Sequence, residues 1–221
     1  MSQDPSPSRD FWSGLVLIVA PLLSVFAMAH HPTAHGETTA DRLSSMIRQA
    51  TLGSWVHGAL IALMVAIFIA LVTFAGRLGW TSGRVRAGVI AYFVGVICMV
   101  GAALVSGFLV PGLAERYVDS SPTEMEASLP VFHLAHEANQ ALAKAGAVGM
   151  STGIFFWSLV LIARAGWLRA VGAFGLAAGL LPILGLIVGR LHLDVHGMLA
   201  VVVAQALWQI AVGVWLLRGD A

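Results

Sequence analysis

The chain has 221 residues, of which 58% are hydrophobic and 10% are charged, and its mean hydropathy is +0.87. Soluble domains carry about 25% charged residues, so this composition indicates an integral membrane protein whose main partner is the lipid bilayer. The sequence has no basic patch for a nucleic acid and no Gly-x-x-x-x-Gly-Lys loop for a nucleotide, and a lone Cys98 cannot form a disulfide framework.

Six apolar stretches are long enough to cross a hydrocarbon core of about 30 Å at about 1.5 Å per residue. We predict an all-α bundle, one transmembrane domain over residues 1–221, in a bacterial-type inner membrane. Assembly into a homo-oligomer or with another membrane protein is left open. The expected spans lie near 11–29, 55–76, 87–110, 145–165, 169–189 and 195–217.

The charges predict how the chain is oriented. Segments 1–10, 77–86, 164–169 and 218–221 hold seven arginines and three acids, whereas the opposite segments hold five basic residues and eight acids. The positive-inside rule therefore places both termini in the cytoplasm.

The first span ends in "FAMAHH", an Ala-x-Ala pattern that a signal peptidase favours. Arg9 is the only basic residue before this span, and Pro21 interrupts its apolar run, so we expect an uncleaved anchor. Cleavage would instead leave His30 as an amino-terminal histidine, whose amine and ring chelate copper.

Two segments between spans are predicted to be helical. "ADRLSSMIRQATL" places four apolar residues from Leu43 to Ala50 at i, i+3, i+4 and i+7, which favours a short amphipathic helix on the outer membrane surface. A Ser-x-x-Glu cap, Ser121 to Glu124, begins a polar-faced helix that leads into the fourth span.

Polar and small residues inside the spans favour helix packing. Two small-xxx-small pairs, beginning at Gly175 and Gly185, let a neighbouring helix approach closely. Gln205 and Gln209 are expected to form interhelical hydrogen bonds, and a polar path leading down from the histidines is the alternative. No span has an acidic residue at its middle, which argues against a proton-driven transporter.

The histidines carry the functional hypothesis, because the predicted topology places all eight on the outer side. "VHGAL" at 56–60 and "VHGML" at 195–199 each open a helix that runs inward, so His57 and His196 are expected at similar depth, facing one another if their helices are neighbours. His192 and His196 are spaced i, i+4, a common chelating arrangement. Glu137 and Asp194 are candidate oxygen ligands or acceptors that orient the rings.

The main hypothesis is a periplasmic-facing site for zinc, copper or iron, because imidazole-rich sets suit these metals. With an open coordination position it would activate water, and Glu137 or Asp194 would be the general base. Whether the protein is an enzyme stays open. The candidate ligands are His30, His31, His35, His57, His133, His136, His192 and His196.

Two alternatives remain. One is a b-type haem held by His57 and His196, with room provided by Gly58 and Gly197 and a propionate bound by Arg190. The other is a non-catalytic membrane subunit or scaffold whose histidines respond to pH. The sequence contains neither the HExxH pattern nor the HxxHH pattern of familiar membrane metalloenzymes.

Overall fold

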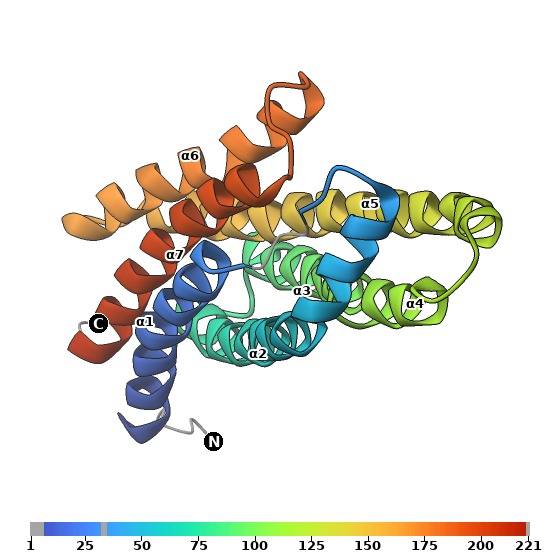
Figure 1. The fold of residues 1–221 in the computed structure, drawn as a ribbon. Helices are drawn as coiled ribbons and strands as arrows, with labels where there is room; N and C mark the ends of the chain where they lie inside the picture. The colour runs from blue at the N-terminus through green and yellow to red at the C-terminus, as the bar shows by residue number, and fades with distance from the viewer. Residues whose placement is uncertain (1–6, 32–34, 220–221) are drawn as a thin grey trace.

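The computed structural model describes residues 7–31 and 35–219, and this part of the chain is helical with no β-strand (Figure 1). The elements are α1 (Pro7–Ala29), α2 (Thr39–Leu78), α3 (Gly83–Leu104), the π-helical turn η1 (Val105–Leu109), α4 (Val110–Tyr117), α5 (Pro122–Leu161), α6 (Trp167–Ile187) and α7 (Val195–Arg218).

Within the described residues, six helical stretches are long and apolar enough to cross a membrane. The third of them joins α3, η1 and α4 into one rod, Gly83–Tyr117. The prediction of an all-α, multi-pass membrane protein is confirmed. The side of the membrane on which each terminus lies stays a prediction.

The helices α2 and α5 contain 40 residues each and begin well before the spans expected from the sequence. Both start with capping boxes, Thr38 with Asp41 and Ser121 with Glu124, so that the cap predicted at Ser121 is present. The segment 40–52, expected as a separate surface helix, is instead the first part of α2. No helix-breaking proline follows it before Leu78, and nothing ends the helix between the cap and the span.

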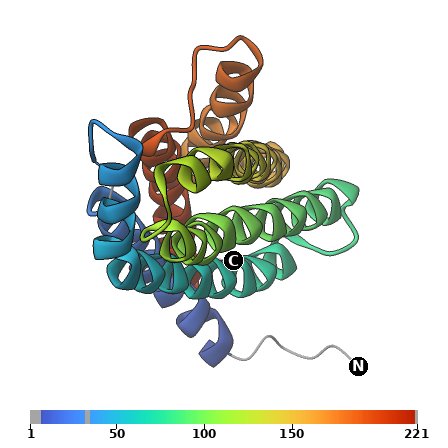
Figure 2. The same ribbon diagram turned by 45° about the vertical axis from the view of Figure 1, so that its right-hand side comes forward.

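Close helix contacts depend on glycine. On the α3–α5 interface a Cβ at Gly149 would lie 2.7 Å from Cα of Gly95, so the two backbones touch there. Gly14 of α1 and Gly213 of α7 form a similar contact (Figures 1 and 2). The predicted packing role is confirmed at Gly175, which lies against Ser158 and Trp208.

One end of the bundle has an aromatic core, which we call the aromatic half. Trp157 and Trp208 are fully buried and stack with ring centroids 6.1 Å apart, and the Phe74 ring lies edge-on to both. Arg77 forms a 2.9 Å ion pair with the buried Asp10.

The glutamines of α7 form the interhelical hydrogen bonds that the sequence predicted. The Gln205 amide donates to Oγ of Ser151 at 3.1 Å, and the Gln209 amide donates to the Tyr92 hydroxyl at 3.0 Å. Because all four residues are buried, these bonds satisfy polar groups that would otherwise destabilise the bundle.

Candidate functional site

The site begins with the π-helical turn η1, where polar side chains from two other helices bind the irregular backbone. Asn139 of α5 donates from Nδ2 to the Ala102 carbonyl and to Oγ of Ser106, both at 2.8 Å. Ser54 of α2 donates from Oγ to the Gly107 carbonyl at 2.8 Å. π-turns occur frequently at functional sites. This one is held by hydrogen bonds from α5 on one side and from α2 on the other.

The turn places a glycine against His57. Gly107 is buried, and a Cβ there would lie 2.6 Å from Cγ of the imidazole. His57 itself is only 6% exposed, and its Nδ1 lies 2.7 Å from the Gly53 carbonyl one turn earlier in α2. A carbonyl only accepts, so Nδ1 carries the proton and the neutral ring has its lone pair on Nε2.

The partner of His57 Nε2 is His31, which directly follows the last turn of α1. The two Nε2 atoms are 3.2 Å apart, and the rings meet edge to face with centroids 4.8 Å apart. Since the lone pair of His57 accepts, Nε2–H of His31 donates this hydrogen bond. The histidine pair, His31 and His57, joins α1 to α2.

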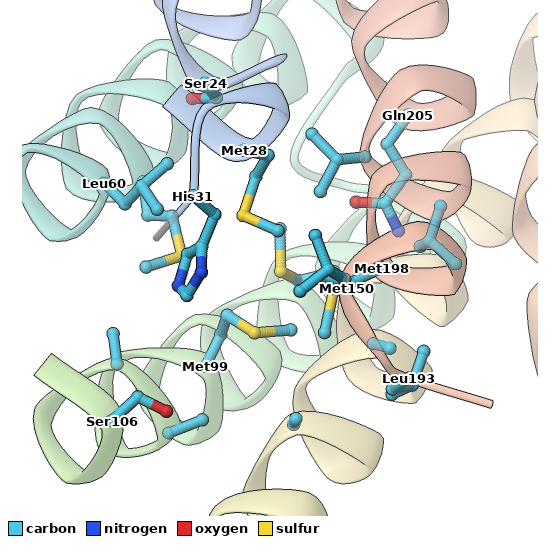
Figure 3. A pocket seen from close by; sticks show the side chains of 18 of the residues that line it. Ser24, Met28, His31, Leu60, Met99, Ser106, Met150, Leu193, Met198 and Gln205 are labelled. Carbon is cyan, nitrogen blue, oxygen red and sulfur yellow. The ribbon is translucent and has the colours of Figure 1, made fainter. Parts of the chain in front are cut away.

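A cavity of about 290 Å³ adjoins the histidine pair, with walls from α1, α2, α3, α5 and α7. Five methionines line it, and we call it the methionine cavity. Figure 3 shows His31 and four of these methionines around the same space. Gln205 and Gln209 also line the cavity, so they contribute to its wall in addition to their hydrogen bonds. The lining methionines are Met28, Met64, Met99, Met150 and Met198.

A second cavity, of about 260 Å³, meets the histidine pair from the side of the first turns of α2. Met46, Gln49 and His136 line it, together with both members of the pair. The two cavities also share Ser106 and Asn139 in their walls. The histidine pair therefore lies between them.

The structure does not bring His57 and His196 together. His196 is the second residue of α7, is exposed, and lines neither cavity, whereas His57 lies deep within α2 and is buried. The expected correspondence of the two Val-His-Gly motifs fails because α2 begins near Thr39, long before its motif, and α7 begins at its motif.

The remaining histidines are dispersed over the surface. His133, His136 and His192 are exposed, and His30 directs its ring toward Phe26, with Nδ1 2.9 Å from the Phe26 carbonyl. His35 is exposed as well. Across residues 7–31 and 35–219, no group of three or more His, Cys, Asp or Glu side chains is arranged to hold a metal ion.

Asp194 and Gly197 shape the start of α7. The Asp194 carboxylate accepts a 2.8 Å hydrogen bond from the Gly197 amide and caps the helix. A Cβ at Gly197 would collide with the His192 carbonyl, so this glycine is needed by the turn itself. Asp194 also lines the methionine cavity.

Three other residues of the sequence hypotheses line neither of the two cavities. Glu137 and Arg190 are exposed and line neither cavity. The nearest atom to a Cβ at Gly58 would be Cζ of Phe108, at 3.9 Å, so this glycine leaves open space beside α2.

Sequence reasoning missed the methionines and the pairing of His31 with His57. One available signal was the position of Met28, a single helical turn before His31. Asn139, which bonds to the π-turn, lies one helical turn beyond His136 in the sequence.

No family model, no curated protein and no solved structure matches this chain. The fold defines the class: a multi-pass membrane protein with six membrane-length helices among its described residues. Its distinguishing site is a histidine pair between two cavities, with His57 buried and His31 half-buried.

Proposed function

We propose that this protein binds a transition-metal ion near the outer face of a bacterial-type inner membrane, with His31 and His57 as ligands. The observation that carries the proposal is the 3.2 Å separation of their Nε2 atoms. Two nitrogens bound to one tetrahedral ion at about 2.0 Å are about 3.3 Å apart, so the separation suits two ligands of one ion, toward which both lone pairs must turn.

The environment of His57 supports this role. Metal-ligating histidines usually donate their second ring N–H to a carbonyl or carboxylate, as His57 Nδ1 does to Gly53. Binding requires the proton on His31 Nε2 to move to Nδ1, which leaves both imidazoles neutral. Protons compete with the metal for the same lone pairs, so affinity is expected to fall as the pH falls.

Binding has better support than catalysis. A hydrolytic site needs a general base beside the metal-bound water. Glu137 is exposed outside both cavities, and the Asp194 carboxylate already caps α7.

The haem alternative has less support. Axial histidines lie on opposite faces of a macrocycle, but His31 occupies the Nε2 side of His57, and His196 is exposed outside both cavities. In the scaffold alternative, the hydrogen bond between His31 and His57 has a structural role, which is to link α1 to α2.

Elemental analysis of the full chain, purified without a histidine tag, tests the proposal. We expect stoichiometric zinc, copper or iron in the wild type and in His133→Ala, an exposed matched control. His31→Ala and His57→Ala are expected to lose the metal while keeping wild-type helicity by circular dichroism. Equal metal content in all four proteins would refute the proposal, and a Soret band would select haem.

A further inference from the structure

The methionines of this chain converge on one place. Five of the eight line the methionine cavity, and each comes from a different helix: Met28 from α1, Met64 from α2, Met99 from α3, Met150 from α5 and Met198 from α7. These positions are far apart in the sequence, so no local pattern accounts for the gathering.

Core packing accounts for part of these side chains, because Met64 and Met150 pack against the aromatic core and Met99 and Met198 against a smaller apolar cluster. Methionine is commonly used to fill irregular gaps in a core, because its thioether chain is flexible. Here the methionines surround a volume of about 290 Å³ that they leave open. Figure 3 shows Met28, Met99, Met150 and Met198 around the space that the His31 ring also faces.

Thioether sulfurs are the most numerous side-chain donors in this wall. Cys98 does not line the cavity, and Asp194, which does, caps α7 with its carboxylate. The other donors are the imidazoles of the histidine pair and the amides and hydroxyls of Asn139, Gln140, Gln205, Gln209, Ser24 and Ser106. Thioethers favour monovalent copper, whereas carboxylates and water suit hard divalent ions.

Charge points to the same ion. Apart from the Asp194 carboxylate, the donors in this wall are neutral, so most of the charge of a bound cation is left uncancelled beside predominantly apolar walls. The desolvation cost rises with the square of the charge, which makes a divalent ion about four times as costly as a monovalent one.

From the thioether donors and the small compensating charge of the wall, we infer that the ligand is monovalent copper, Cu(I), bound by the histidine pair together with thioethers of the methionine cavity. This inference rests on the proposed metal site and names its ion. The second cavity, on the far side of the pair, is the entry side for the ion in the predicted orientation. Copper arrives and stays reduced, and no redox step is involved.

The test measures Cu(I) affinity of the full chain in detergent, with ascorbate present and bathocuproine disulfonate as the competing chelator. The central variant combines Met28→Leu, Met99→Leu and Met150→Leu, because leucine retains volume and apolarity while removing sulfur. Met125→Leu is the matched control, since Met125 lies on α5 but lines neither cavity.

We expect the triple variant to bind Cu(I) at least about tenfold more weakly, which corresponds to about 1.4 kcal/mol. Its Zn(II) affinity and that of Met125→Leu for both ions are expected to match the wild type. X-ray absorption at the copper edge is expected to detect sulfur neighbours in the wild type and fewer in the triple variant. Should the triple variant lose helicity, the single Met28→Leu and Met150→Leu variants are expected to give smaller losses in the same direction.

The thioether assignment would be overturned if the folded variants kept wild-type Cu(I) affinity and X-ray absorption detected no sulfur neighbour of copper in any protein. If His31→Ala and His57→Ala still lose Zn(II) when the thioether assignment fails, the proposed metal site stands without thioether ligands. A wild-type chain that binds Zn(II) but not Cu(I) likewise overturns only the inference. A chain that binds neither ion overturns both.

Discussion

The two ends of the bundle use the same helices for different purposes. The aromatic half, around Trp157, is filled by stacked and edge-on rings, whereas the end around His57, which we call the histidine half, encloses cavities of about 290 and 260 Å³. Along α2 the change occurs between Phe74 and His57, about 25 Å apart at the rise of an α-helix.

The difference indicates that one end of the bundle stabilises the fold and the other provides the cavities. Close packing and an ion pair between Asp10 and Arg77 hold α1, α2 and α7 together in the aromatic half. The histidine half, by contrast, leaves two cavities open in its interior. A preformed cavity with a few convergent polar groups is what ligand binding requires.

The largest expected effect is on stability in the aromatic half. Trp157→Ala removes a fully buried ring that touches Phe74, Tyr92 and Trp208, and we expect a loss of about 3–5 kcal/mol in the free energy of unfolding. Met198→Ala in the metal-free protein is expected to cost less than about 2 kcal/mol, because its side chain borders an existing cavity. Denaturant titration in detergent measures both, and equal losses would contradict the division between the halves.

A smaller loss of stability is expected from Arg77→Ala. It leaves the Asp10 carboxylate, whose side chain is 11% exposed, without its partner and removes the Arg77 cation–π contact with Trp215. We expect a cost of about 2–3 kcal/mol, below the range for fully buried pairs because the Arg77 side chain is 21% exposed. Adding Asp10→Asn is expected to restore part of the thermal stability, and a further drop in the double variant would argue against the pairing.

The third effect is on binding in the histidine half. A Cβ at Gly107 would overlap the His57 side chain, so Gly107→Ala is expected to displace the ring and weaken metal binding about tenfold. Gly58→Ala is the matched control, because the nearest atom to its new Cβ is 3.9 Å away. Titration with Zn(II) measures both affinities. Unchanged Zn(II) affinity in Gly107→Ala would show that metal binding does not depend on the contact between the π-turn and His57.

The helices themselves were largely predictable from the sequence, because hydropathy, capping and small-residue spacing act locally. The length of the apolar runs predicted the spans, the Ser121–Glu124 pattern predicted the start of α5, and the polar residues Gln205 and Gln209 predicted interhelical hydrogen bonds.

The histidine half was not predictable in the same way, because its contacts join residues from different helices. The shared Val-His-Gly motif suggested that His57 and His196 meet, but a short motif does not determine how far it lies from the start of its helix. In a hydropathy pattern methionine is indistinguishable from other apolar residues, and the five cavity methionines come together only when five helices are assembled.

The smallest expected effect concerns Asp194, which the sequence presented as a ligand or general base. The structure places its carboxylate on the Gly197 amide, so Asp194→Ala is expected to cost about 1 kcal/mol through loss of the α7 cap. Asp194→Asn keeps a capping oxygen and is expected to be near wild type in thermal stability. Neither variant is expected to change metal affinity, because His31 and His57 do not depend on this carboxylate for their contact. Weaker binding in both variants, with stability lost only in Asp194→Ala, would show that the charge acts on the ion as well as on the helix.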